Sequence, residues 1–121
     1  MLKIVTKTFK ELSLDELYAV LQLRSEVFVV EQNCVYQDID NKDQKAMHIM
    51  GYKSDQLVAY TRIFKPDDYF ESASIGRVLV KVGERHSKYG YAIMEASINV
   101  IEKTYGETKI NIAAQTYLKR F

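Results

Sequence analysis

The sequence predicts a single α/β (α+β) domain over residues 1–121, with a mixed, mostly antiparallel sheet flanked by helices in the order β-α-β-β-β-α-β. Two stretches carry apolar residues at helical spacing, with capping residues at their ends. Three strand-like segments in the middle are joined by short, turn-forming connections, which is typical of an antiparallel meander. The five strand-like segments are residues 2–9, 47–53, 57–64, 74–82 and 108–114.

The N-terminal part of the chain predicts one strand and one helix. Residues 2–9 alternate like a strand with two partly usable faces. Ser13 and Glu16 form a capping box, which starts a helix that we expect to run from about residue 14 to residue 27. The apolar run V-F-V-V-E-Q should continue or follow that helix into the core and end near Gln32. The expected apolar face of the helix is Leu14, Leu17, Tyr18 and Leu21.

Residues 33–45 are polar and acidic, with Asp38, Asp40 and Asp43 close together. Because a D-x-D pair begins a calcium-binding loop, a metal site is one interpretation. The glycine that such a loop needs at its sixth position is Asp43 here, and the glutamate at its twelfth position is Ile49. The sequence therefore predicts an ordinary loop with Asx-type turns and no metal.

The middle of the chain predicts the meander. Residues 54–56 join two strands at hairpin spacing, and residues 65–68 form the next turn. Gly76 lies inside the strand that follows, where a glycine often marks a bulge or a close approach of another backbone. Arg62 and Arg77 lie within neighbouring strands, so each needs a carboxylate or a ligand as a partner.

The C-terminal part predicts a helix, a strand and the beginning of another helix. Gly106 is expected to end the first of these helices. The strand at residues 108–114 should run parallel to the preceding strand through a right-handed crossover. Residues 115–121 begin a helical pattern with half an apolar face, Leu118 and Phe121, so we expect the sequence to be C-terminally incomplete. The face of the first helix is predicted to be Ile93, Ala96, Ser97, Val100 and Thr104, flanked by Met94, Ile98 and Ile101.

The loop between the fourth strand and its helix, residues 83–91, has features of a phosphate-binding turn. It contains glycine and opens a helix, and the first-turn N–H groups of a helix have no intrahelical partners. Arg85, His86 and Lys88 add side-chain donors and positive charge. The loop matches neither G-x-G-x-x-G nor the P-loop pattern. Two interpretations stay open: it holds the diphosphate of a nucleotide-bearing cofactor, or it is an ordinary connection with solvated basic residues.

Composition narrows the classes of function. The chain has 121 residues, of which 47% are hydrophobic, enough for one core. A net charge of +1 gives no basic excess for a nucleic-acid partner, and no apolar run approaches the ~20 residues that span a membrane. Cys34 is the single cysteine, which excludes an internal disulfide framework and suits the cytoplasm. No neighbour in sequence activates this thiol, so we interpret it as a bystander.

Several blocks of the chain are distinctive: V-F-V-V-E-Q-N-C, A-Y-T-R-I, I-G-R-V-L-V and A-A-Q-T-Y-L-K-R-F. With the order of elements, they resemble the GNAT superfamily of acyl-CoA-dependent N-acetyltransferases, and within it the ElaA group. The resemblance covers nearly the entire chain. It implies a GNAT-like fold whose last helix and strands are cut short, and acetyl-CoA (coenzyme A) as the co-substrate, without a metal.

The same resemblance implies a cofactor site. In GNAT enzymes the pantetheine arm lies in the gap where the fourth and fifth strands separate at a bulge. The backbone groups implied here are those of Val78, Leu79 and Val80. The family's loop motif is Q/R-x-x-G-x-G/A, which this chain matches at Arg85 and Gly90, with Lys88 in place of the first glycine. The implied loop set is Arg85, His86, Ser87, Lys88, Tyr89, Gly90 and Tyr91.

The implied reaction is transfer of an acetyl group to a primary amine of a small molecule or peptide, by direct attack in a ternary complex. The N–H of Val80 is the candidate donor to the oxyanion. Glu31 ends an apolar run and is a candidate base; the alternative is a structural carboxylate paired with Arg24 or Arg62. His48 opens a strand and could shuttle a proton or line the acceptor pocket; the alternative is an ordinary strand-end histidine.

A function of another class is a non-catalytic acyl-CoA-binding or interaction module. The tyrosine that superfamily members often use as an acid would follow Phe121, and Tyr117 does not match its position. A chain that stops there exposes the edge of its last strand and half an apolar helix, which invites dimerisation. A homodimer is therefore a candidate assembly, and neither a nucleic acid nor a membrane is an expected partner.

Overall fold

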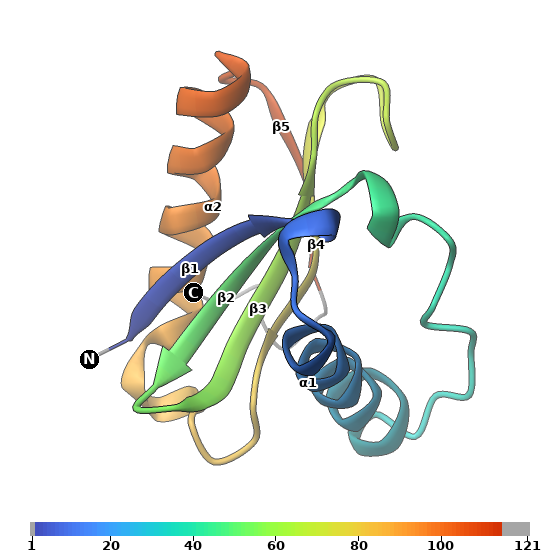
Figure 1. Ribbon diagram of the computed structural model, residues 1–121, viewed down its shortest axis with the longest axis vertical. Coiled ribbons are helices and arrows are strands. Elements are labelled where there is room, and N and C mark those ends of the chain that lie inside the picture. The colour runs from blue at the N-terminus through green and yellow to red at the C-terminus, as the bar shows by residue number, and fades with distance from the viewer. Residues whose placement is uncertain (1, 115–121) are drawn as a thin grey trace.

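The computed structural model describes residues 2–114, and it confirms the predicted fold class and order of elements. Five strands form one sheet in the order β1-β2-β3-β4-β5 (Figure 1). Neighbouring strands pair antiparallel, except that β4 and β5 run parallel. The strands are β1 Lys3–Thr8, β2 Met47–Lys53, β3 Gln56–Phe64, β4 Ala73–Val80 and β5 Ile110–Ala114.

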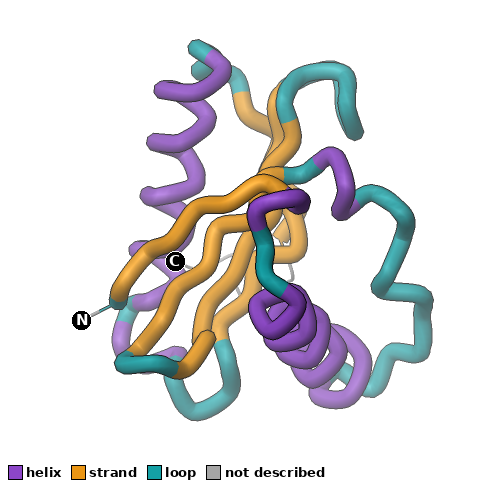
Figure 2. The backbone as a smooth tube through the Cα atoms, in the orientation of Figure 1, coloured by secondary structure: helices purple, strands orange, loops and turns teal. Residues whose placement is uncertain are grey.

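Two helices cover opposite faces of this sheet (Figures 1 and 2). Helix α1 spans Leu14–Arg24 and helix α2 spans Tyr89–Tyr105. The core beneath α1 includes Val20, Leu23, Val27, Phe28, Met50, Tyr60 and Leu79. The core beneath α2 includes Ile49, Ile63, Ile75, Val78, Val80, Ile93, Met94 and Ile101. Within residues 2–114, no helix combines the length and apolar composition needed to cross a membrane.

The start of α1 forms as its sequence predicts. The Ser13 hydroxyl accepts a hydrogen bond from the Glu16 N–H at 3.0 Å, and the Ser13 N–H donates to the Glu16 carboxylate at 2.8 Å, which confirms the capping box. Past Arg24 the chain continues as a π-helical segment, Ser25–Glu31, and buries Val27 and Phe28. The prediction that this apolar run extends the helix into the core is therefore confirmed for Val27 and Phe28, whereas Val30 is 72% exposed.

The predicted face of α1 is partly wrong. Leu14 is 86% exposed and Tyr18 is 74% exposed, while Val20, Leu23 and Arg24 are buried. Both sets of residues have helical spacing, so periodicity does not choose between them. Arg24 can lie on the buried face beside Val20 and Leu23 because its charge is neutralised there by aspartates that lie 14 and 19 residues along the chain.

Strand β4 contains the predicted bulge. Between Tyr60 and Arg62 of β3, one residue opposes two residues of β4, and β4 carries the same extra residue against β5. The left-handed backbone lies at Arg77, whose φ is +51°, and not at Gly76. A Cβ at Gly76 would meet no atom within 4 Å among the described residues. Gly76 therefore marked the place of the bulge without carrying its unusual conformation.

Helix α2 ends at Gly106, whose φ of +66° confirms the predicted C-terminal glycine. Its buried face centres on Ile93, Met94, Ser97 and Ile101, whereas Thr104, predicted on that face, is exposed. Beneath α2, the hydroxyls of Thr61 and Ser97 meet at 2.6 Å, and Ser97 donates to the carbonyl of Ile93 at 2.7 Å. The helical pattern predicted at residues 115–121 lies outside the described residues.

Candidate active site

The C-terminal end of β4 directs one backbone amide toward the β5 side of the sheet. The Lys81 N–H donates to the Val58 carbonyl of β3 at 2.7 Å. Because backbone polar groups alternate along a strand, the N–H and carbonyl of Val80 point away from β3. The Val80 carbonyl accepts a hydrogen bond from Nε of Arg85 at 2.9 Å. The N–H of Val80 therefore points toward the β5 side of the sheet, which is the direction that a hydrogen-bond donor to an oxyanion on that side would need.

The loop that follows β4 contains two residues in the left-handed backbone conformation. Gly83 has a φ of +91° and Lys88 a φ of +61°, on either side of a 3₁₀ turn at Arg85–Ser87. Helix α2 begins at Tyr89, and its first regular backbone bond runs from the Ala92 N–H to the Lys88 carbonyl. Lys88 therefore takes the left-handed conformation that glycine adopts most easily, at the position where the GNAT motif has its first glycine.

The N-terminus of α2 has the geometry of an anion-binding site. The side chain of the residue preceding the helix, Lys88, does not cap it. The side chains of His86, Ser87, Lys88 and Tyr91 are exposed around this first turn, whereas Tyr89 packs against the core. The side chains of Val78 and Leu79 lie in the two cores, so only their backbone groups are available at the sheet. First-turn amides and nearby cationic side chains are what a diphosphate requires.

Glu31 and Arg85 form an ion pair beside this loop. The two guanidinium nitrogens of Arg85 lie 2.5 and 2.7 Å from the two carboxylate oxygens of Glu31, and both side chains are about one-third exposed. The alternative that Glu31 pairs with Arg24 or Arg62 is wrong. The π-helical segment carries Glu31 to the loop that follows β4, so Glu31, Arg85 and Val80 converge at the end of β4.

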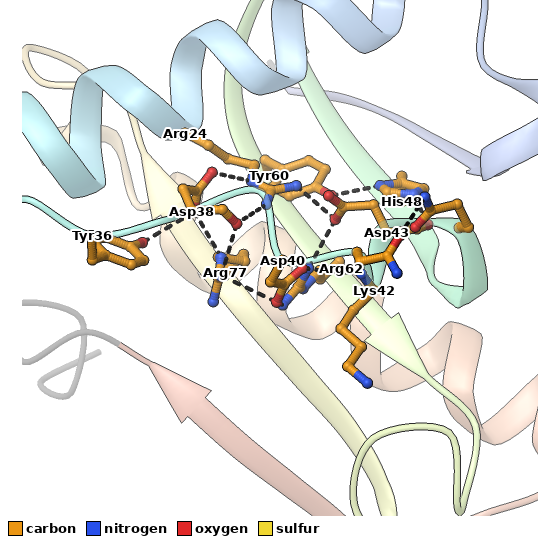
Figure 3. A network of polar contacts seen from close by, with 12 residues as sticks. Arg24, Tyr36, Asp38, Asp40, Lys42, Asp43, His48, Tyr60, Arg62 and Arg77 are labelled. Atoms are coloured by element: carbon orange, nitrogen blue, oxygen red, sulfur yellow. Dashed lines mark hydrogen bonds and ion pairs between the residues drawn. The ribbon is translucent and has the colours of Figure 1, made fainter.

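A network of charged side chains lies on the α1 side of the sheet (Figure 3). Its members are Arg24, Arg62 and Arg77 and three aspartates of the loop after α1, Asp38, Asp40 and Asp43. Asp43 accepts from Arg24 at 2.7 Å and from Arg62 at 2.9 Å. These two arginines are 0% and 1% exposed, so their charges depend on the aspartates for compensation.

The network confirms that the strand arginines need carboxylates. Burial by itself raises the pKa of Asp40, but the hydrogen bonds and charge of Arg62, with Arg77, outweigh it and hold the pKa at about 2. Asp40 also accepts from the backbone N–H of Lys42 at 3.2 Å, an Asx-type turn of the predicted kind. In the part of the chain that the structure describes, no three His, Cys, Asp or Glu residues are arranged to hold a metal ion.

His48 is fully buried behind this network. Its Nε2 lies 3.0 Å from the carbonyl of Asp43, so Nε2 carries the proton, and Nδ1 accepts from the Tyr60 hydroxyl at 2.5 Å. Burial lowers the pKa of His48, which keeps the ring neutral at pH 7. Sequence analysis identified His48 but missed Tyr60, which only the register between β2 and β3 brings to it. A catalytic role for His48 stays a prediction.

The bulged fourth strand, the parallel fifth strand and the cationic loop that opens α2 define the chain as a GNAT-type acyltransferase fold. It is 46% identical to protein ElaA of Escherichia coli over 113 residues, which are 92% of this chain and 74% of that protein. The chain therefore belongs to the ElaA family, as its sequence blocks indicated. No protein-family model matches it.

Solved structures agree. The crystal structure of Escherichia coli ElaA matches with a TM-score of 0.91 and 43% identity, covering 100% of this chain and 83% of that one. An acyl-CoA N-acyltransferase from Pseudomonas aeruginosa matches with a TM-score of 0.90 and 37% identity, covering 99% and 84%. A predicted acetyltransferase with acetyl-CoA from Clostridium acetobutylicum shares the fold, with a TM-score of 0.70 and 13% identity over 98% and 84%.

Proposed function

We propose that this protein is an acetyl-CoA-dependent N-acetyltransferase that transfers an acetyl group to a primary amine of a small molecule or peptide. The observation that carries the proposal is the convergence at the end of β4: an outward-facing Val80 amide, Arg85 bound to the Val80 carbonyl, and the N-terminus of α2. The similar protein from Pseudomonas aeruginosa is an acyl-CoA N-acyltransferase by name, which supports the same chemistry here.

The residues present fit a coenzyme A ester. Bound acetyl-CoA would supply the activated acyl group and a thiolate leaving group. The first-turn amides of α2, with the side chains of the 83–91 loop, would hold its diphosphate, since the helix N-terminus favours anions. The Val80 N–H would donate to the oxygen of the acetyl carbonyl as negative charge develops there.

Glu31 is the proposed base. Its carboxylate lies beside Arg85 and is about one-third exposed, so a water molecule or an incoming amine can reach it. An amine must lose its proton before or during attack, and a carboxylate can accept that proton directly or through water. Most of the rate would come from holding the amine and the thioester in contact.

The first test is titration of the protein with acetyl-CoA by calorimetry. We expect Arg85→Ala to weaken binding by about tenfold or more, because a charge-assisted hydrogen bond is worth ~1.5–3 kcal/mol. Gly90→Pro removes one first-turn N–H from α2 and should weaken binding similarly. Lys65→Ala, a change in the turn between β3 and β4, is the control and should leave affinity unchanged. Unchanged affinity in both test variants would remove the cofactor assignment.

Turnover with a panel of primary amines separates the two classes of function. Acetylation of any of these amines supports the proposed acetyltransferase activity. Tight binding of acetyl-CoA without acetylation of any amine supports the alternative, a non-catalytic acyl-CoA-binding module. The amine acceptor, a homodimeric state and a cytoplasmic location stay predictions.

A further inference from the structure

Arg77 holds an unfavourable backbone conformation at the bulge of β4. Its φ is +51°, a left-handed value that costs a residue with a Cβ roughly 1–2 kcal/mol. Its neighbour Gly76, which would adopt that conformation without cost, does not use it. At Arg77 this conformation coincides with a side chain that is held by contacts to another part of the chain.

Those contacts come from the loop after α1 (Figure 3). Nε of Arg77 donates to the Asp38 carboxylate at 2.8 Å, and one terminal nitrogen donates to the Asp38 carbonyl at 3.0 Å and to Asp40 at 3.3 Å. The guanidinium also lies 5.8 Å from the centre of the Tyr36 ring, whose hydroxyl donates to the Asp38 carboxylate at 3.1 Å. Within residues 2–114, the hydrogen bonds of the Arg77 guanidinium all go to Asp38 and Asp40.

Asp38 is itself fixed to the body of the protein. The fully buried Arg24 of α1 donates from Nε to the Asp38 carboxylate and from a terminal nitrogen to the Asp38 carbonyl, each at 2.9 Å. Asp38 therefore joins a helix on one face of the sheet to the bulge in β4. A contact chain made of two buried or half-buried ion pairs is stiffer than a surface loop.

We propose that Arg77 is a positioning residue: anchored by Asp38 and Asp40, it sets the course of β4 through the bulge and so aims the backbone amide of Val80 at the acyl group. This inference rests on the proposed function and deepens it. Arg77 lies one residue before Val78 and acts through the backbone, without contact to substrate. Small misplacement of reacting groups can cost about 100-fold in rate, so loss of the Arg77 contacts could lower the rate of acetyl transfer strongly.

Two substitutions separate the anchor from the backbone strain. Arg77→Gly removes the anchor and relieves the left-handed strain, so the protein should keep its fold. Arg77→Ala removes the anchor and keeps the strain. We expect both to bind acetyl-CoA about tenfold more weakly than the wild type by calorimetry, and Arg77→Lys to recover part of that loss. Lys7→Ala removes a more exposed ion pair on the far edge strand and should bind like the wild type.

Amide hydrogen exchange of the free protein gives a readout that needs no cofactor. Arg77→Gly should speed exchange in β4 near the bulge about tenfold while the Met50 amide of β2 exchanges as before. Normal acetyl-CoA affinity in Arg77→Gly with loss in Arg77→Ala alone would overturn the anchor, since backbone conformation would then suffice. Unchanged exchange in β4 would overturn it as well. A wild-type protein that binds no acetyl-CoA would instead refute the proposed function, and exchange would still decide whether Arg77 fixes the bulge.

Discussion

Replacing Asp43 by asparagine tests whether the arginine network is held together by charge. The change keeps the shape of the side chain and leaves Arg24 and Arg62, at 2.7 and 2.9 Å, without their shared counter-ion. Three arginines and three aspartates balance in the native protein, so the substitution leaves a net positive charge beside two fully buried guanidiniums. Breaking a buried ion pair costs about 3–5 kcal/mol.

That cost is a large part of the stability of a domain of this size, about 5–15 kcal/mol. With an unfolding entropy of about 2.1 cal/mol/K per residue, it lowers the melting temperature by roughly 12–20 °C. Thermal and urea unfolding, followed by circular dichroism at pH 7, measure the change. Asp55→Asn, in the exposed turn between β2 and β3, is the matched control and should change stability by less than ~0.5 kcal/mol. A melting temperature of Asp43→Asn like that of the control would refute the argument.

Three further predictions concern Asp40 of the arginine network, Lys88 before α2 and the Glu31–Arg85 pair. Because the pKa of Asp40 is held at about 2 against an ordinary 3.8, its stabilisation is present above pH 4 and is lost as the pH falls through 2. Urea unfolding should show about 2 kcal/mol of this loss, and Asp40→Asn should remove that share of the pH dependence, while Asp43, whose pKa is also lowered, keeps its own share. Lys88→Gly relieves the left-handed strain and should raise the melting temperature by roughly 2–4 °C; a lower value would contradict the strain. Glu31→Gln should barely change stability, since the pair is partly exposed, but should raise KM for acetyl-CoA and lower kcat; unchanged kinetics would exclude Glu31 from the site.

Features that depend on neighbours in sequence were predicted well. The capping box at Ser13, the hairpin between β2 and β3 and the glycine that ends α2 each follow from a few adjacent residues. The bulge in β4 was also found, through Gly76. Arg85 and the start of α2 are also close in sequence, so the sequence alone placed them in the same loop.

Features that depend on distant partners were not predictable. The buried face of α1 includes Arg24, and its burial makes sense only once Asp38 and Asp43, 14 and 19 residues later, are known to reach it. The pairing of Glu31 with Arg85 joins residues 54 positions apart. Left-handed conformations at Arg77 and Lys88 gave no signal either, because neither residue type favours them.

The hydroxyl pair beneath α2 has a consequence for how the helix is seated. Since Ser97 donates to Ile93, the Thr61 hydroxyl donates to Ser97, and this bond exists at one height of the helix only. Sliding α2 by a single turn, about 5.4 Å, would put isoleucine opposite Thr61. The Thr61 hydroxyl would then be buried among apolar side chains without a hydrogen-bond partner, at a penalty of about 1–3 kcal/mol. The hydrogen bond of Thr61, a residue in the middle of the sheet, thereby fixes the position of α2 along its axis and so how far the start of the helix projects beyond the strands.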